Sequence, residues 1–140
     1  MEEKIIFGKG QPLSEEAKQH FTGNCYVNDM VPFESPYNVI VSNVTFEPGS
    51  RNHWHIHPAG QILLVTGGQG WYQEYGKPAR ALKAGDVVQI PGGVKHWHGA
   101  AKDSGFVHLA VEPDIAAGPP KWLEEVSEKD YQTLEWRENA

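Results

Sequence analysis

The sequence contains very little cysteine, with Cys25 as its single example. One cysteine cannot form a disulfide within the chain, which is the usage expected in a reducing cytosol. Its neighbours, Asn24 and Tyr26, offer no obvious base that would activate a thiol. We therefore interpret Cys25 as a packed side chain rather than as a nucleophile.

Long apolar segments and basic runs are also missing. The first residues, Met-Glu-Glu-Lys-Ile-Ile, include neither an apolar segment nor a small-residue cleavage site. We therefore expect a non-secreted, cytoplasmic protein without a transmembrane segment. The formal net charge is −6, and Lys and Arg do not cluster. This argues against nucleic acid and anionic membranes as partners and leaves a small-molecule substrate as the expected one.

Glycine and proline, by contrast, are frequent. The 140 residues include 15 glycines and 10 prolines scattered between short apolar runs, a pattern typical of many short strands joined by tight turns. The length suits one domain with a real core. We predict a single all-β domain, either a sandwich or a barrel. The expected strands cover residues 38–46, 51–57, 61–66, 70–75, 86–90, 96–100 and 106–112.

Helical signals occur only near the two ends. Ser14 followed by two glutamates predicts the N-terminus of a short helix, because the hydroxyl caps the helix and the acids complement its dipole. Residues 127–130, Ser-Glu-Lys-Asp, resemble a capping box before a second helix over 131–137. Residues 113–120, rich in proline, are predicted to connect the barrel to that helix.

Three histidines and one glutamine stand at strand spacing. His55 and His57 share a face because alternate side chains of a strand point the same way. Gln61 follows the turn Pro58-Ala59-Gly60, and His96 follows a second Pro/Gly turn. Imidazole with an oxygen donor suits Mn, Fe, Ni, Cu or Zn. This pattern predicts a transition-metal site.

Strand parity also suggests the walls of a cavity. Ser42 and Val44 share one face of residues 40–46 and would line the cavity if that face points inward. His108 shares a face with Ala110 and Glu112. Both faces of this second strand carry apolar residues, so parity leaves two interpretations of His108 open. It is either a pocket residue or an ordinary hydrogen-bonded strand histidine.

The motifs resemble those of the cupin family. The first cupin motif, with Gln in place of its Glu, matches Gly49, His55, His57, Gln61 and Gly68. The second matches Gly85, Pro91, Gly93 and His96, with Ala100 in the position of its Asn. The resemblance implies a double-stranded β-helix of the jelly-roll class, usually found as a dimer. It would be one cupin domain over residues 1–140, with a barrel core of about 38–112 and terminal arms 1–37 and 113–140.

Nearly the whole chain also resembles a subgroup of single-domain bacterial cupins that carry this Gln. Some members are manganese-dependent hydroxynitrile lyases, and others are associated with carboxymuconolactone decarboxylases. The resemblance implies a divalent metal, manganese first with Fe, Ni or Zn as alternatives, bound by His55, His57, Gln61 and His96. It places His108 and His98 at catalytic positions, and we favour His108 as the base, with His98 as second choice because it shares a strand face with His96. The implied pocket-wall residues are Ser42, Val44 and Glu112.

Two residues depart from the pattern of this subgroup. His53 shares strand parity with His55 and His57, but we expect a bystander, because three ligands from one short strand would strain the coordination geometry. Glu112 would place a carboxylate at the pocket wall, where it would act as a base or repel anionic substrates. The neutral Gln61 leaves a divalent centre with its full +2 charge, which favours Lewis acidity but weakens metal retention.

Three functions therefore compete. The first is a metal-dependent lyase acting on small carbonyl or cyanohydrin compounds. The second is another metal cupin enzyme, such as a dioxygenase or an isomerase in aromatic catabolism, and the third is a non-catalytic barrel that binds small molecules. Trp54, Trp71 and Trp97 are expected at barrel rims or interfaces, and Trp122 and Trp136 as packing anchors near the C-terminal helix.

Overall fold

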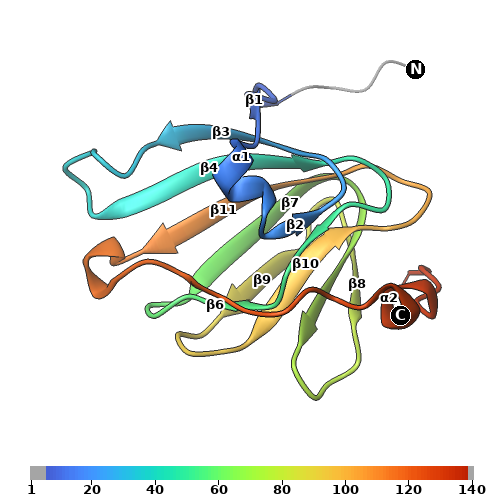
Figure 1. The fold of residues 1–140 in the computed structure, drawn as a ribbon. Helices are drawn as coiled ribbons and strands as arrows, with labels where there is room; N and C mark the ends of the chain where they lie inside the picture. The colour runs from blue at the N-terminus through green and yellow to red at the C-terminus, as the bar shows by residue number, and fades with distance from the viewer. Residues whose placement is uncertain (1–5, 139–140) are drawn as a thin grey trace.

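The strands form one continuous antiparallel sheet that curls around a central core (Figure 1). The computed structural model describes residues 6–138. The strand order is β1-β3-β4-β11-β7-β10-β5-β2, with β8 and β9 pairing with β7, and β6 pairing with β10 and β12. This is the all-β barrel that the glycine-rich pattern predicts. The strands are β1 (Gln11–Pro12), β2 (Phe21–Thr22), β3 (Cys25–Val31), β4 (Val39–Phe46), β5 (Arg51–Asn52), β6 (His55–Ile56), β7 (Gln61–Glu74), β8 (Arg80–Lys83), β9 (Val87–Ile90), β10 (His96–Ala100), β11 (Phe106–Pro113) and β12 (Lys121–Trp122).

Strand β7 replaces two predicted strands and joins the two halves of the barrel. Its first residues pair with β9 and β11, and its last residues pair with β8 and β10. The break expected after Thr66 is a bulge, because the register against β11 shifts between Val107 and His108. Gly68 has a φ of +73°, and a Cβ there would collide with the carbonyl of Gly105. Glycine is therefore needed where the strand bends, and the chain continues without a turn.

The predicted strand over residues 51–57 is, by contrast, interrupted. Arg51 pairs with Gly99 and His55 pairs with His96, so the five residues 51–55 lie opposite the four residues 96–99 of β10. The extra residue reverses the parity on either side of it. The backbone N–H groups of His53 and Trp54 donate instead to His20 and Glu124, which belong to the terminal segments.

Five strands lie outside the predicted ranges: the longer strands β3 and β8, and the two-residue strands β1, β2 and β12. Strand β3 pairs with β4 over Cys25–Val31 and therefore belongs to the curled sheet although it precedes residue 38. Its alternation of apolar and polar residues is weak, since Asn28 and Asp29 follow each other. Strand β8 pairs with β7 through Arg80–Lys83.

A short helix lies near each end of the chain. Helix α1 (Glu15–Lys18) is capped by Ser14, as predicted. Helix α2 (Glu128–Gln132) begins directly after its cap, Ser127, so the prediction of a helix over 131–137 placed it too late. A 3-10 turn, η1 (Ile115–Ala117), lies within the predicted connector. Within residues 6–138 no helix is long and apolar enough to cross a membrane.

Two apolar clusters stabilise the fold. The larger fills the barrel and includes Phe46, Leu63, Leu82 and Phe106, each at most 1% exposed. Burying a side chain of this size contributes about 1.5–3 kcal/mol. The second cluster lies under the C-terminal segment and contains Trp71, Trp97, Val126 and Tyr131, with Trp54 and Trp136 packed against it. Trp71 and Trp97 are therefore core residues rather than the rim residues that were expected.

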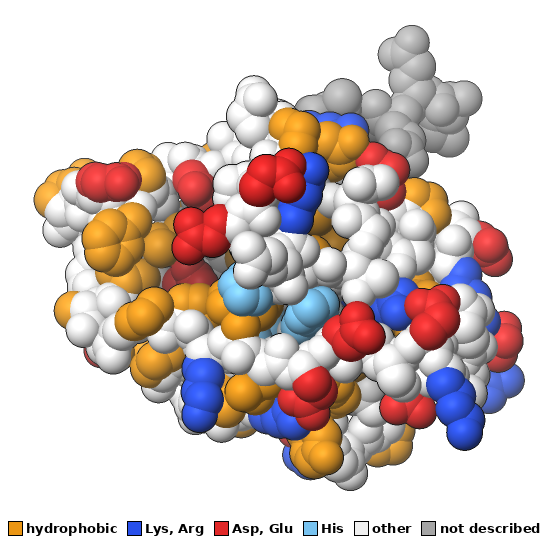
Figure 2. All heavy atoms as spheres, viewed as in Figure 1, with side chains coloured by type: hydrophobic (Ala, Val, Ile, Leu, Met, Phe, Trp, Pro, Cys, Tyr) orange, Lys and Arg blue, Asp and Glu red, His pale blue; other side chains and the backbone are white. Residues whose placement is uncertain are grey.

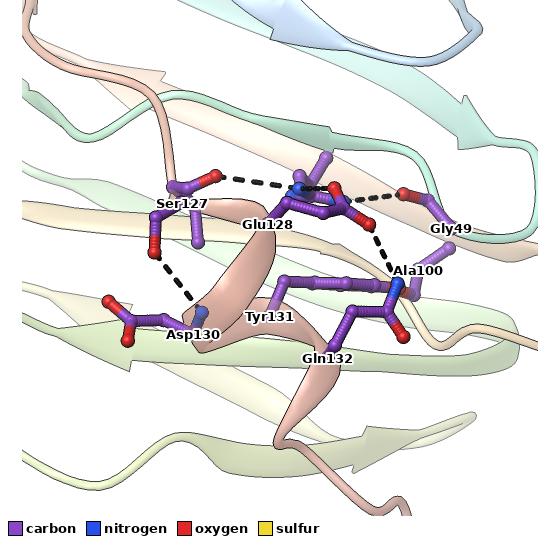
Figure 3. Close-up of polar contacts among 9 residues, drawn as sticks. Gly49, Ala100, Ser127, Glu128, Asp130, Tyr131 and Gln132 are labelled. Atoms are coloured by element: carbon purple, nitrogen blue, oxygen red, sulfur yellow. Dashed lines mark hydrogen bonds and ion pairs between the residues drawn. The ribbon is translucent and has the colours of Figure 1, made fainter.

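A buried arginine, Arg51, attaches helix α2 to the barrel. Figure 3 shows Glu128 and Tyr131 of this helix beside Gly49 and Ala100. The Arg51 guanidinium donates to the Gly49 carbonyl and to the Glu128 carboxylate, and it lies 3.9 Å from the centroid of the Tyr131 ring. The Tyr131 hydroxyl donates to the Ala100 carbonyl at 2.6 Å. Because a buried cation must be paired to be tolerated, these contacts hold the C-terminal segment against β5 and β10.

Candidate metal centre and cavity

The four predicted metal ligands lie together inside the barrel. His55 comes from β6, His57 follows it, Gln61 opens β7, and His96 opens β10. The ring centroids of His55 and His96 are 4.2 Å apart, and that of His57 lies 5.0 Å from His55 and 5.8 Å from His96. The Gln61 Oε1 atom lies 3.4 Å from His96 Nε2. The turn before Gln61 and the turn before His96 thus bring the four side chains together inside the barrel.

Each of the three imidazoles has its Nδ1 atom engaged by an oxygen. His55 Nδ1 lies 2.8 Å from the His53 carbonyl, and His96 Nδ1 lies 2.9 Å from the Val94 carbonyl. His57 Nδ1 lies 3.1 Å from Oε1 of Glu112. An oxygen acceptor at Nδ1 keeps the proton on that atom and leaves Nε2 with a free lone pair. This tautomer is the one in which histidine binds a metal through Nε2.

The contact between Gln61 and His96 also fits a metal ion. With the proton of His96 on Nδ1, both Nε2 and the Gln61 Oε1 atom are hydrogen-bond acceptors, and they face each other at 3.4 Å. Two acceptors cannot form a hydrogen bond with each other, whereas a cation could bind the lone pairs of both atoms. Three imidazoles and one amide oxygen form a donor set suited to a divalent transition metal.

Burial keeps these imidazoles neutral. Desolvation lowers the pKa of His57 to about 4, and repulsion from His96 adds to the shift. Desolvation also places the pKa of His55 well below its usual value of 6.5, with repulsion from His96 and His57 contributing. The pKa of His96 is lowered by burial as well. Neutral imidazole is the form that binds metals, so no proton has to be released at neutral pH.

A second histidine group shares His55 and His96 with the first and adds His98. The ring nitrogens of His55, His96 and His98 include atoms that all lie within 4.8 Å of one another. His98 is also held by the protein, since Nε2 of His108 lies 3.1 Å from its Nδ1. The Asn52 amide contacts the His98 ring, and its Oδ1 accepts the His98 backbone N–H at 2.9 Å. His98 therefore stands between the four-residue cluster and His108.

The two candidate bases, His98 and His108, differ in whether they line the cavity. His98 lines a cavity of about 140 Å³ beside the cluster, whereas His108 is fully buried and is not among the lining residues. Burial lowers the pKa of His108 to about 4 and places that of His98 well below 6.5, with repulsion between the two rings contributing for His98. Within residues 6–138, His108 Nδ1 has no hydrogen-bond partner. The structure thus brings His98, rather than His108, to the cavity.

The predicted pocket-wall residues lie on this cavity. Ser42 and Val44 from β4 line it together with Ala110 and Glu112 from β11, so the inward faces are those of Ser42 and His108. Burial and repulsion from Asp29 raise the pKa of Glu112. His57 and Glu112 also line a groove of about 470 Å³ whose other walls include Phe33, Ile40, Ile115 and Pro119. Figure 2 shows hydrophobic side chains around a hollow on this side of the molecule.

Asn52 and Trp122 line the cavity although neither was expected there. Strand parity assigned the inward position to His53, but the extra residue between β5 and β6 gives it to Asn52. His53 contributes its carbonyl to His55, and its side chain does not line the cavity. Trp122 pairs with His55 across β12 and β6, with ring centroids 4.7 Å apart, rather than anchoring the C-terminal helix.

Cys25 is buried and burial raises its pKa to about 12, as suits a packed thiol.

Comparison with known proteins agrees with this architecture. The model of the cupin domain family matches residues 42–112. The chain is 40% identical over 112 residues to (R)-mandelonitrile lyase of Granulicella tundricola, covering 80% of this chain and 86% of that protein. A crystal structure of a cupin-like protein from Thermotoga maritima matches with a TM-score of 0.87 and 50% identity, over 93% of this chain and 96% of that one. Oxalate decarboxylase of Bacillus subtilis, which has Mn(II) centres, shares the fold with a TM-score of 0.59 and 24% identity, over 81% of this chain and 30% of that one.

Proposed function

The chain belongs to the cupin domain family, and on that premise we propose that it is a metal-dependent lyase that cleaves small cyanohydrins to a carbonyl compound and hydrogen cyanide. The observation that carries the proposal is the position of His98, a neutral imidazole on the wall of a cavity that adjoins the His55, His57, Gln61 and His96 cluster. The 40% identity to a protein named mandelonitrile lyase supports the same reaction class.

The four-residue cluster would hold the metal ion. When bound, a divalent cation, manganese in our proposal, would supply Lewis acidity toward the substrate hydroxyl oxygen and offset the negative charge that develops there. Gln61 contributes an oxygen without a charge, so the four donors leave the charge of the cation undiminished.

His98 is the base in this proposal. Its lowered pKa leaves a ring nitrogen free of a proton at neutral and mildly acidic pH, so the ring accepts the proton of the cyanohydrin hydroxyl. The oxygen then forms the carbonyl double bond, and the carbon–carbon bond breaks with its electron pair leaving on cyanide. Cyanide takes up the proton from the imidazolium and leaves as hydrogen cyanide.

Its neighbours position this base. His108 Nε2 contacts the His98 ring from the buried side, and the amide of Asn52, which lines the cavity, contacts it as well. His108 is fully buried and does not line the cavity. We therefore assign His108 to orienting His98, although the sequence favoured it as the base.

The test is benzaldehyde release from racemic mandelonitrile at mildly acidic pH. Manganese-loaded protein should release benzaldehyde above the buffer rate, chelator-treated protein should not, and His55→Ala should abolish the difference. Release at the buffer rate by protein with bound metal would reject the lyase. Oxygen uptake with catechol and diketone substrates would then test the dioxygenase alternative, and turnover of a lactone would test the isomerase.

A further inference from the structure

Glu112 stands where the cavity meets the apolar groove. It lies near the end of β11 and lines both spaces, and the same is true of His57. Its Oε1 atom is 3.1 Å from His57 Nδ1, and the two side chains are 23% and 8% exposed. The contact is thus largely shielded from solvent, which preserves its strength.

The direction of this hydrogen bond matters for the cluster. A carboxylate can only accept, so His57 Nδ1 carries the proton and its Nε2 keeps the lone pair. His55 and His96 are oriented in the same way, but by the backbone carbonyls of His53 and Val94. His57 is therefore the one member of this trio whose orienting partner is an ionisable side chain and can be removed by mutation.

The contact between Glu112 and His57 also matters for the charge around the four metal-binding side chains. Its donors are three imidazoles, held neutral by burial, and one amide, so the donors themselves supply no negative charge to a divalent cation. The Glu112 carboxylate reaches the cluster through the His57 ring. A carboxylate hydrogen-bonded to a ligating histidine makes the imidazole a stronger donor and fixes its orientation.

We propose that Glu112 is a positioning residue for the metal, which orients His57 and supplies the negative charge that the four donors lack. This inference rests on the metal centre of the proposed function. It gives Glu112 a role other than that of a base or an electrostatic gate for substrates. Removing such a partner lowers metal affinity about 10–100-fold in comparable sites.

Asp29 provides a matched control. Its carboxylate, on β3, accepts a hydrogen bond from the Ser42 hydroxyl at 2.6 Å. It acts on Glu112 through its charge, but no contact joins it to His55, His57, Gln61 or His96 among the hydrogen bonds and ion pairs of residues 6–138. Asp29→Asn therefore removes one negative charge that acts on Glu112 and leaves the His57 contact intact.

The experiment measures the dissociation constant of Mn²⁺ from the full chain by competition with a fluorescent chelator, without any substrate. We expect Glu112→Ala to weaken binding about 10–100-fold. Glu112→Gln keeps an oxygen that can accept from Nδ1 but loses the charge, so it should weaken binding by less than Glu112→Ala. Asp29→Asn should stay within about twofold of the wild type, and circular dichroism should show that each variant is folded.

Two results would overturn the inference. One is Mn²⁺ binding by Glu112→Ala within about twofold of the wild type. The other is an equal loss in Asp29→Asn and Glu112→Gln, which would assign the effect to the general negative charge of this region. Wild-type protein that binds no Mn²⁺ would reject the metal centre itself, whereas wild-type protein that binds the ion but cleaves no mandelonitrile would reject only the lyase.

Discussion

Nε2 of His108 lies 3.1 Å from Nδ1 of His98, and of these two rings only that of His98 reaches the wall of the cavity. In the proposed reaction, a proton taken up by His98 would lie next to a second imidazole that does not line the cavity. This relationship separates the roles of two histidines that a strand pattern treats alike.

The first prediction concerns these two histidines. His98→Ala should lower kcat/KM for mandelonitrile about 10²–10⁴-fold, the usual contribution of a general base. His108→Gln should cause a smaller loss, because glutamine can still place a polar atom beside the His98 ring. His53→Ala is the control, since its side chain does not line the cavity, and should retain the wild-type rate. A larger loss in His108→Gln than in His98→Ala would return the base role to His108.

The second prediction identifies the metal ligands by thermal unfolding. Mn²⁺ at about 100 times its Kd should stabilise the folded wild type by roughly 2.7 kcal/mol, which raises Tm by several degrees. His96→Ala should lose this shift. His98→Ala should keep it if His55, His57, Gln61 and His96 are the ligands. Loss of the shift in His98→Ala, with His57→Ala unaffected, would instead indicate a site built from His55, His96 and His98.

The third prediction is a loss of stability of the metal-free protein in acid. The pKa of His108 is about 4 in the folded state, against an ordinary value of 6.5. Between these values the unfolded chain binds a proton that the folded chain does not, so the free energy of unfolding falls as the pH is lowered from 6.5 toward 4. His108 contributes up to about 1.4 kcal/mol per pH unit in this window. His108→Gln should flatten the curve measured by urea denaturation, and parallel curves for the two proteins would contradict this account.

The fourth prediction concerns the attachment of helix α2. Tyr131→Phe removes the hydroxyl that donates to the Ala100 carbonyl at 2.6 Å in a buried setting. Loss of such a bond should cost roughly 1–3 kcal/mol of unfolding free energy. Thr133→Ala deletes a hydroxyl with an exposed hydrogen bond at the end of the same helix and should cost less than about 0.5 kcal/mol. Similar effects of the two variants would show that the Tyr131 hydroxyl does not secure the helix.

Much of the barrel and of the metal cluster follows from local sequence. Glycine and proline mark most of the turns, and the spacing of His55, His57, Gln61 and His96 around two such turns is a property of short segments. For β4 and β11, alternation determined which side chains share a face, and the resemblance to the cupin subgroup indicated which face points inward, since it implied Ser42 and Val44 as wall residues. Where a strand is continuous, local spacing determines which side chains meet.

Tertiary structure determined the rest of the site, because one extra residue in a strand reverses which side chains face the cavity. The bonds from His53 and Trp54 to His20 and Glu124 join segments distant in sequence, and the bulge between β5 and β6 turns Asn52 to the cavity in place of His53. Distance along the chain also hid the contact of Trp122 with His55, and that of Glu112 with His57. Local sequence also did not show that His98 from β10 lines the cavity whereas His108 from β11 is fully buried and does not. Local sequence determined which side chains could form the site, and only the packing of distant strands decided which of them orient the others.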